Sequence, residues 1–172
     1  MQLKSRYAIC ASIIFFLFLA ASCGTVLKSK PGTTTTVILI RHANRDEAGH
    51  LTPRGRERAR SLVAAVGNMG ISAIYSPNLE RNINTVKPLA DHLGLDITLT
   101  PKVSLFQVGR ISKEILTKHA GEVVLWVGNV SGNLQAIYHR LGGEGKGPLD
   151  YGQLYILRVP DQGATQVTKS TF

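Results

Sequence analysis

Short apolar runs alternate with longer amphipathic stretches along most of this chain. Residues 37–40, 71–75 and 123–127 form apolar runs of the length typical of buried strands. Residues 53–69 and 79–93 place apolar side chains at three- and four-residue spacing, which indicates helices with one buried face. This alternation predicts a doubly wound α/β domain with a mostly parallel sheet and helices on both faces.

Residues typical of helix ends and turns refine the boundaries of the predicted elements. Thr52-Pro53 is a typical helix start, and Gly70 is placed to end that helix. Pro88 falls inside the second helix and should kink or weaken it. Further along, the pattern predicts a strand at 96–100, a short helix at 112–118 and a helix at 134–141. Residues 154–159 and 165–169 flank a turn and predict an antiparallel hairpin at the sheet edge.

The first 23 residues differ from the rest of the chain. Lys4 and Arg6 precede an almost wholly apolar stretch at 8–21, and Ala20-Ala21-Ser22-Cys23 follows. This is the pattern of a signal peptide, and its end resembles a bacterial lipobox in which the cysteine is lipidated. We therefore expect a lipoprotein-type signal peptide at 1–22, a tether at 23–34 and a folded domain at 35–172. The protein would then be exported and held on a membrane, facing the periplasm or the cell exterior, by lipid on Cys23. Ordinary secretion and an uncleaved anchor are the alternatives.

Charge and ligand spacing narrow the function classes. The formal net charge is +9, but the basic residues are spread out and no nucleic-acid motif is present, so no nucleic-acid partner is expected. The five histidines show no metal-ligand spacing, and we expect neither a metal site nor a cofactor.

Several short motifs occur in a characteristic order. They are Leu39-Ile40-Arg41-His42-Ala43, Leu51-Thr52-Pro53-Arg54-Gly55, Ile74-Tyr75-Ser76-Pro77 followed by Arg81, and Leu89-Ala90 followed by Leu93-Gly94-Leu95. In this order and spacing the chain resembles the histidine phosphatase (phosphoglycerate mutase-like) superfamily over roughly residues 35–159.

The resemblance implies a mechanism and a site. His42 would attack a phosphomonoester and become phosphohistidine, and water would then release phosphate. Arg41 and Arg81 match the arginines that clamp the phosphoryl oxygens, and Asn44 and Thr52 are further candidate substrate-binding residues. The expected partner is a phosphorylated small molecule or phosphate itself.

The chain departs from the family pattern at two points. Asn129 stands where the family has a second histidine, and an amide can donate a hydrogen bond but carries no charge. The family's acidic proton donor is also missing, because residues 101–110 contain no carboxylate and Gln107 is the nearest in shape. By sequence, Asp46 and Glu47 are the carboxylates nearest to His42. Three hypotheses follow: an exported phosphatase that is impaired at Asn129, a phosphate-binding module without turnover, and a structural envelope lipoprotein without a ligand.

Overall fold

The computed structural model describes residues 25–101, 105–131 and 133–172. The predicted signal peptide and the lipidation site Cys23 lie outside these residues. The strands are β1 (Thr34–Arg41), β2 (Ile71–Pro77), β3 (Ile97–Thr100), β4 (Val123–Gly128), β5 (Gln153–Pro160) and β6 (Gln166–Thr171). The helices are α2 (Pro53–Val66), α3 (Glu80–Leu93), α4 (Leu105–Lys118) and α5 (Asn133–Arg140). In the described residues, no helix combines the length and apolarity needed to cross a membrane.

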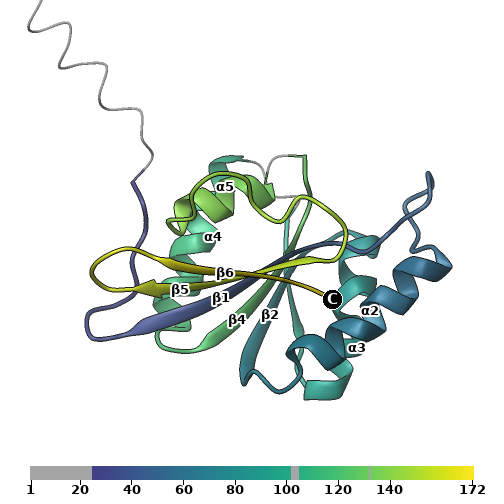
Figure 1. Cartoon of the computed structure of the whole chain (residues 1–172), viewed down its shortest axis with the longest axis horizontal. Coiled ribbons are helices and arrows are strands. Elements are labelled where there is room, and N and C mark those ends of the chain that lie inside the picture. The colour runs from purple at the N-terminus through teal and green to yellow at the C-terminus, as the bar shows by residue number, and fades with distance from the viewer. Residues whose placement is uncertain (1–24, 102–104, 132) are drawn as a thin grey trace, which may run out of the picture.

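The six strands form one sheet in the order β3-β2-β4-β1-β5-β6. β1, β2, β3 and β4 run parallel, whereas β5 pairs antiparallel with β1 and β6 pairs antiparallel with β5. Figure 1 shows α2 and α3 on one face of this sheet and α4 and α5 on the other. The predicted doubly wound α/β fold with an antiparallel edge hairpin is confirmed.

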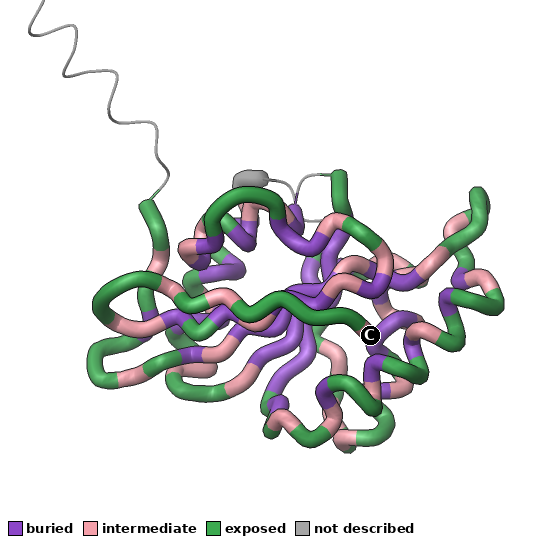
Figure 2. The backbone as a smooth tube through the Cα atoms, viewed as in Figure 1, coloured by how far each residue is buried: buried purple, intermediate pink, exposed green. Residues whose placement is uncertain are grey.

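The strands β1, β2, β4 and β5 supply side chains to two separate apolar cores. In β1, Val37 and Leu39 pack with α4 and α5, while Ile38 and Ile40 pack with α2 and α3. This division follows from the pleat, which points successive side chains to opposite faces. All four side chains are fully buried, and Figure 2 shows the same burial along the central strands. A strand covered on both faces is apolar at every position, which is why this run was recognisable in the sequence.

Three helices differ from the prediction. α2 ends at Val66 with Gly67 as its C-cap, so Gly70 does not end it. α4 begins at Leu105, so the short helix expected at 112–118 is the second half of a 14-residue helix. Gly109, a poor helix former, obscured its first half. α3 continues through Pro88 to Leu93, because the packing of its apolar face outweighs the hydrogen bond that a proline removes.

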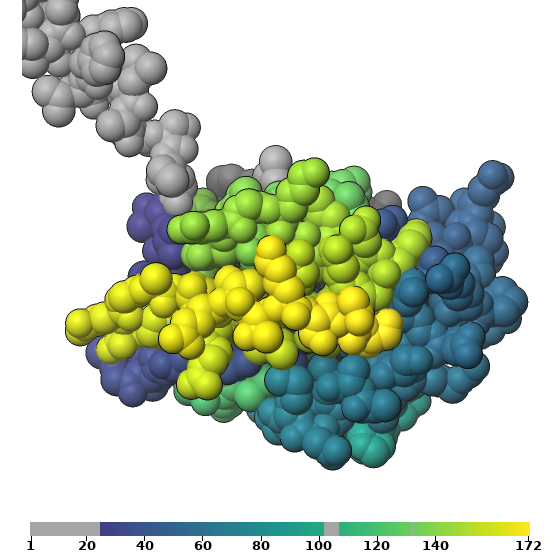
Figure 3. Space-filling model, viewed as in Figure 1, coloured from purple at the N-terminus to yellow at the C-terminus, as the bar shows by residue number. Residues whose placement is uncertain are grey.

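The described part of the predicted tether is docked on the domain. The Leu27 amide donates to the Arg140 carbonyl at 2.8 Å, and the Ser29 hydroxyl donates to the Val159 carbonyl at 2.7 Å. At the other end of the domain, the chain terminus at Phe172 lies against α2, where it packs with the α2–α3 core. Figure 3 shows the β5–β6 hairpin reaching across to this helix.

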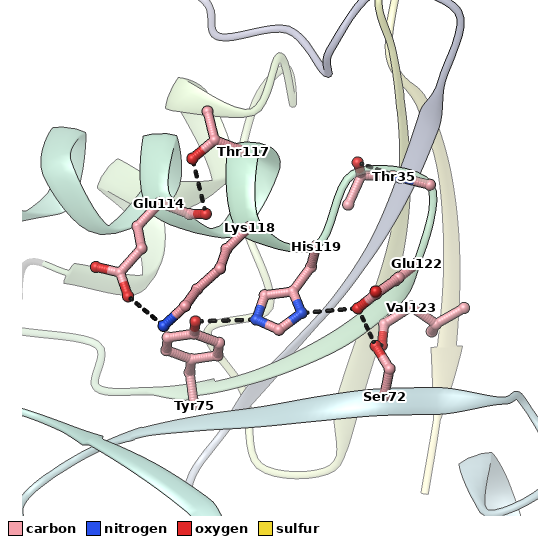
Figure 4. A network of polar contacts seen from close by, with 10 residues as sticks. Thr35, Ser72, Tyr75, Glu114, Thr117, Lys118, His119, Glu122 and Val123 are labelled. Carbon is pink, nitrogen blue, oxygen red and sulfur yellow. Dashed lines mark hydrogen bonds and ion pairs between the residues drawn. The ribbon is translucent and has the colours of Figure 1, made fainter.

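A polar network joins the end of α4 to the beginnings of β2 and β4 (Figure 4). His119 lies between the Tyr75 hydroxyl at 3.1 Å and a Glu122 carboxylate oxygen at 2.7 Å, and Ser72 donates to the same oxygen at 2.7 Å. Ser72 and Glu122 lie where these strands start, whereas Arg41, His42 and Asn129 lie at the opposite, carboxyl ends of β1 and β4. We assign the network a structural role, since it cross-links the sheet to α4 away from the candidate site.

Candidate active site

The candidate residues meet at the carboxyl edge of the parallel strands, where open α/β sheets bind ligands. β1 and β4 are adjacent, and their pairing sets Arg41 opposite Gly128. The next residue of each strand is therefore His42 and Asn129, and the His42 amide donates to the Gly128 carbonyl at 3.1 Å. Arg81 enters from the first turn of α3, which follows the neighbouring strand β2.

His42 is held as a neutral imidazole with one nitrogen free. Only 4% of its surface is exposed, and Nδ1 lies 2.8 Å from the Ala43 carbonyl oxygen. Because a carbonyl only accepts, Nδ1 carries the proton and the Nε2 lone pair is left for chemistry. Burial, together with smaller effects of Arg81, Arg41 and Arg45, lowers the pKa of His42 to about 4, although the hydrogen bond to the Ala43 carbonyl acts in the opposite direction. At neutral pH this imidazole is therefore uncharged, as a nucleophilic role would require.

Arg41 is positioned by the loop that precedes β5. Its Nη1 donates to the Leu149 carbonyl at 2.9 Å, and its guanidinium carbon lies 3.7 Å from the ring centroid of Tyr151. The ring of Tyr151 also meets the imidazole of His42 edge to face, with the centroids 5.7 Å apart. Stacking on an aromatic face orients a guanidinium while its remaining N–H groups stay available to an anion.

Arg81 is joined directly to Asn129. Its Nε and Nη2 both donate to the Asn129 Oδ1, at 3.2 and 3.0 Å. The amide oxygen thus orients the guanidinium, and the Asn129 NH₂ group keeps its donors for another acceptor. Asn129 is itself fixed, since its backbone amide donates to Asn133 Oδ1 at the start of α5 at 2.9 Å. The residue that stands where a histidine was expected is therefore the group that orients Arg81.

Thr85 on α3 links the loop after β1, which carries His42, to the first turn of α3, which carries Arg81. The Thr85 hydroxyl accepts from the Ala43 amide at 2.8 Å and donates to the Arg81 carbonyl at 2.7 Å. Thr85 is fully buried. Displacement of α3 would consequently move the loop after β1 as well, so this bond couples the positions of Arg81 and His42.

Asn44 and Thr52 have clear structural contacts. The Thr52 hydroxyl accepts from the Gly55 amide at 3.1 Å and so caps α2, as the sequence predicted. Asn44 Oδ1 accepts from Arg58 at 2.5 Å. A Cβ at Gly55 would lie 2.1 Å from the Asn44 carbonyl oxygen, so only glycine allows this approach of α2 to the loop. Substrate binding by Asn44 and Thr52 stays a prediction.

The other polar residues singled out in the sequence lie outside this cluster. The Asp46 carboxylate accepts from the backbone of its own loop, and His50 pairs with Glu80 at 3.0 Å on the exposed side of α3. Gln107 lies on α4, where its Oε1 is buried and has no hydrogen-bond partner among the residues that the structure describes. Glu47 is exposed. Within residues 25–101, 105–131 and 133–172 no group of three or more His, Cys, Asp or Glu side chains is arranged to hold a metal ion.

A cavity of about 420 Å³ lies between α2 and α3, and His42 does not line it. Arginine and lysine side chains line it together with acidic ones, among them Arg56, Arg60, Lys87, Glu80 and Asp91. None of the four residues that meet at the sheet edge contributes to its wall. We place the candidate active site at His42 and not in this cavity, because His42 brings a neutral imidazole together with the guanidinium groups of Arg41 and Arg81.

Sequence analysis missed Leu149, Tyr151, Thr85 and Asn133. Leu149 and Tyr151 belong to no motif, and they reach the site because β5 runs antiparallel beside β1, so that Ile40 pairs with Leu154. The start of β5 therefore lies next to the end of β1. Tyr151, just before β5, could have been identified from the sequence only if the pairing of β5 with β1 had been known.

The family and the fold were compared with those of known proteins. The model of the histidine phosphatase superfamily (branch 1) matches residues 37–144. A search of curated proteins finds no significant match. Among solved structures, the protein histidine phosphatase SixA complexed with tungstate has a TM-score of 0.61 and 15% identity, covering 79% of this chain and 96% of that one.

Two further solved structures have the same fold. Phosphoglycerate mutase from Plasmodium falciparum has a TM-score of 0.54 and 17% identity, covering 80% of this chain and 90% of its own. Mycobacterial glucosyl-3-phosphoglycerate phosphatase has a TM-score of 0.57 and 12% identity, with coverage of 80% and 97%. The motif order, the sheet topology and a family match over more than half of its length agree: the chain belongs to the histidine phosphatase superfamily (branch 1).

Proposed function

We propose that this protein is a phosphatase that removes the phosphoryl group of a phosphomonoester through a phosphohistidine on His42. The observation that carries the proposal is the neutral imidazole of His42 beside two guanidinium groups, with Nδ1 tied to the Ala43 carbonyl. Nε2 would attack phosphorus, and water would later break the N–P bond and release phosphate. Phosphoryl transfer depends mainly on positioning and on neutralising the phosphoryl oxygens, which suits a buried nucleophile between arginines.

The other site residues would bind the phosphoryl oxygens, each in a different way. Arg41 and Arg81 would each offer N–H donors to the phosphoryl oxygens in the planar geometry that suits an oxyanion. Asn129 would donate through its amide nitrogen while its oxygen keeps Arg81 in place. The tungstate bound by SixA is a tetrahedral oxyanion like phosphate, which makes tungstate a useful probe for this chain.

A second candidate function is phosphate binding without turnover. Two observations favour it: Asn129 replaces the family's second histidine, and the charged groups that shift the pKa of His42 are all arginines. Loss of one preorganised donor lowers a rate by about 10²–10³, and loss of a general acid by about 10²–10⁴. Such a site would keep its affinity for an oxyanion through Arg41 and Arg81.

Phosphate release from a panel of phosphomonoesters by the purified full chain tests the proposal. We expect turnover, and we expect Arg81→Gln to lower kcat/KM by about 100-fold because one oxyanion donor is lost. Arg60→Gln is the matched control, since Arg60 is an exposed arginine of α2. No release from any ester, together with tungstate binding that Arg81→Gln weakens, would replace the phosphatase by the binding module. If tungstate does not bind, both are wrong.

We further propose that the protein is exported and held on a membrane by lipid on Cys23. The positive residues Lys4 and Arg6, the apolar stretch at 8–21 and the Ala20-Ala21-Ser22-Cys23 sequence support this. Metabolic labelling with a fatty acid, followed by membrane fractionation, tests it. The wild type should carry label and sediment with membranes, and Cys23→Ala should lose the label. Equal labelling of both would refute lipidation at Cys23.

A further inference from the structure

Of the carboxylates nearest to the site in the sequence, Glu47 is exposed in the loop after His42, and the other three are engaged elsewhere. Asp46 accepts from its own loop, Glu80 pairs with His50, and Asp150 Oδ2 accepts from the Gln153 amide nitrogen at 2.9 Å. An alkyl phosphate nevertheless needs a proton for its leaving oxygen, because an alkoxide is a poor leaving group. A side chain that packs directly against the site residues is better placed to supply that proton than an exposed loop carboxylate such as Glu47.

Tyr151 is the side chain in position to do so. Its ring packs against both site residues of β1, with the Arg41 guanidinium over its face at 3.7 Å and the His42 imidazole at its edge at 5.7 Å. Tyr151 is thus a hydroxyl-bearing side chain that packs directly against both Arg41 and His42. Burial and Arg45 lower the pKa of Arg81 and Tyr151 raises it, which agrees with a place for Tyr151 in this cluster.

We propose that Tyr151 is the general acid and base of this active site, a proposal that rests on the phosphatase function proposed above. A phenol hydroxyl is a proton donor, and phenols are much stronger acids than the alkyl alcohol that the proton would produce. The Arg41 guanidinium over the ring would stabilise the phenolate once the proton has left.

The Tyr151 hydroxyl gives up its proton in the first of two steps and regains it in the second. In the first, His42 Nε2 bonds to phosphorus, the P–O bond to the leaving group breaks with its electron pair on oxygen, and the Tyr151 proton moves to that oxygen. In the second, water attacks phosphorus, its proton returns to the phenolate, and the N–P bond breaks with its electron pair on Nε2. The protein ends in its starting state, with phosphate and an alcohol as products.

Tyr151→Phe separates the hydroxyl from the ring, because phenylalanine keeps the stacking face for Arg41. We expect kcat/KM for an alkyl phosphate to fall by about 100-fold and that for p-nitrophenyl phosphate to change by less than about threefold, since nitrophenolate leaves without a proton. Tyr151→Leu removes the stacking face as well and should lower both values. Tyr138→Phe is the matched control, because the Tyr138 hydroxyl bonds to the Glu144 carbonyl outside this site.

The outcomes distinguish this proposal from the proposed function. If the wild type hydrolyses p-nitrophenyl phosphate and Tyr151→Phe slows both substrates equally, or neither, Tyr151 is not the proton donor and the phosphatase stands. If the wild type hydrolyses no phosphomonoester, the proposed function fails and the role of Tyr151 fails with it. A circular dichroism spectrum matching that of the wild type would show that Tyr151→Phe is folded.

Discussion

Replacement of His42 by asparagine should lower phosphate release by at least about 10³-fold. The variant lacks the Nε2 lone pair, so the phosphohistidine cannot form and the reaction loses its covalent route. The asparagine is small enough for the buried site, which separates loss of chemistry from loss of fold. Release of phosphate and labelling of the protein by a radioactive phosphomonoester are the two measurements. Both should disappear together, and His92→Asn, at an exposed position of α3, should leave both intact. Turnover that survives in the variant would exclude His42 as the nucleophile.

The same variant should change how stability depends on pH. The pKa of His42 lies near 4 in the folded protein because burial disfavours its charged form, while the unfolded chain should have the ordinary value of about 6.5. Between these values the unfolded state binds a proton that the folded state does not. This contribution to stability is therefore complete above about pH 6.5 and is lost as the pH falls towards 4, by about 3 kcal/mol in all.

Urea unfolding at pH 7 and pH 4.5 measures this difference. The wild type should lose more stability over the interval than the asparagine variant, because the variant has no group that titrates at this position. Equal losses would mean that His42 is not held neutral by burial. The same argument predicts that kcat/KM of the wild type stays level on the acid side well below pH 6.5.

Asn129→His should raise kcat/KM by about 10²–10³ if the rest of the site is intact. A histidine can take up a proton when a phosphate dianion binds, and so add a charged donor to the phosphoryl oxygens. The substitution also loosens the orientation of Arg81, because Asn129 Oδ1 accepts two hydrogen bonds from Arg81 that a single ring nitrogen cannot fully replace. The gain should therefore appear mainly in kcat, with substrate bound and Arg81 turned towards it.

Asn129→Ala is the control for this exchange. It removes the acceptor for Arg81 without adding a donor, and it should lower kcat/KM and weaken tungstate binding. If Asn129→His brings no gain while tungstate still binds, the site has lost more than one residue and the binding module becomes the better description. A gain in the histidine variant would instead show that the other catalytic groups remain competent.

The pattern of residues predicted the fold well wherever local signals agreed with packing. The run at 37–40 is apolar at every position because β1 is covered on both faces, and the Thr52 cap was visible because its hydroxyl bonds to a backbone only three residues away. The first half of α4 was missed because Gly109 is a poor helix former.

The same distinction applies to the candidate site. Arg41, His42 and Arg81 are recognisable from the sequence because each lies in a motif next to a strand or helix end, and Asn129 is recognisable as a departure from such a motif. Local sequence determines the strand or helix end on which each of these residues lies. The sequence by itself thus determined the family and the parallel core of the sheet, and it singled out His42 as the candidate nucleophile.

Tertiary structure alone decided how these residues are used. The bond from Arg81 to Asn129 joins residues that are 48 positions apart, and the stacking of Tyr151 on Arg41 joins the two ends of the domain. Both depend on which strands are neighbours, and strand order is set by the burial of whole faces and not by any local pattern. Burial also shifts the pKa of His42, because desolvation depends on everything packed around the ring.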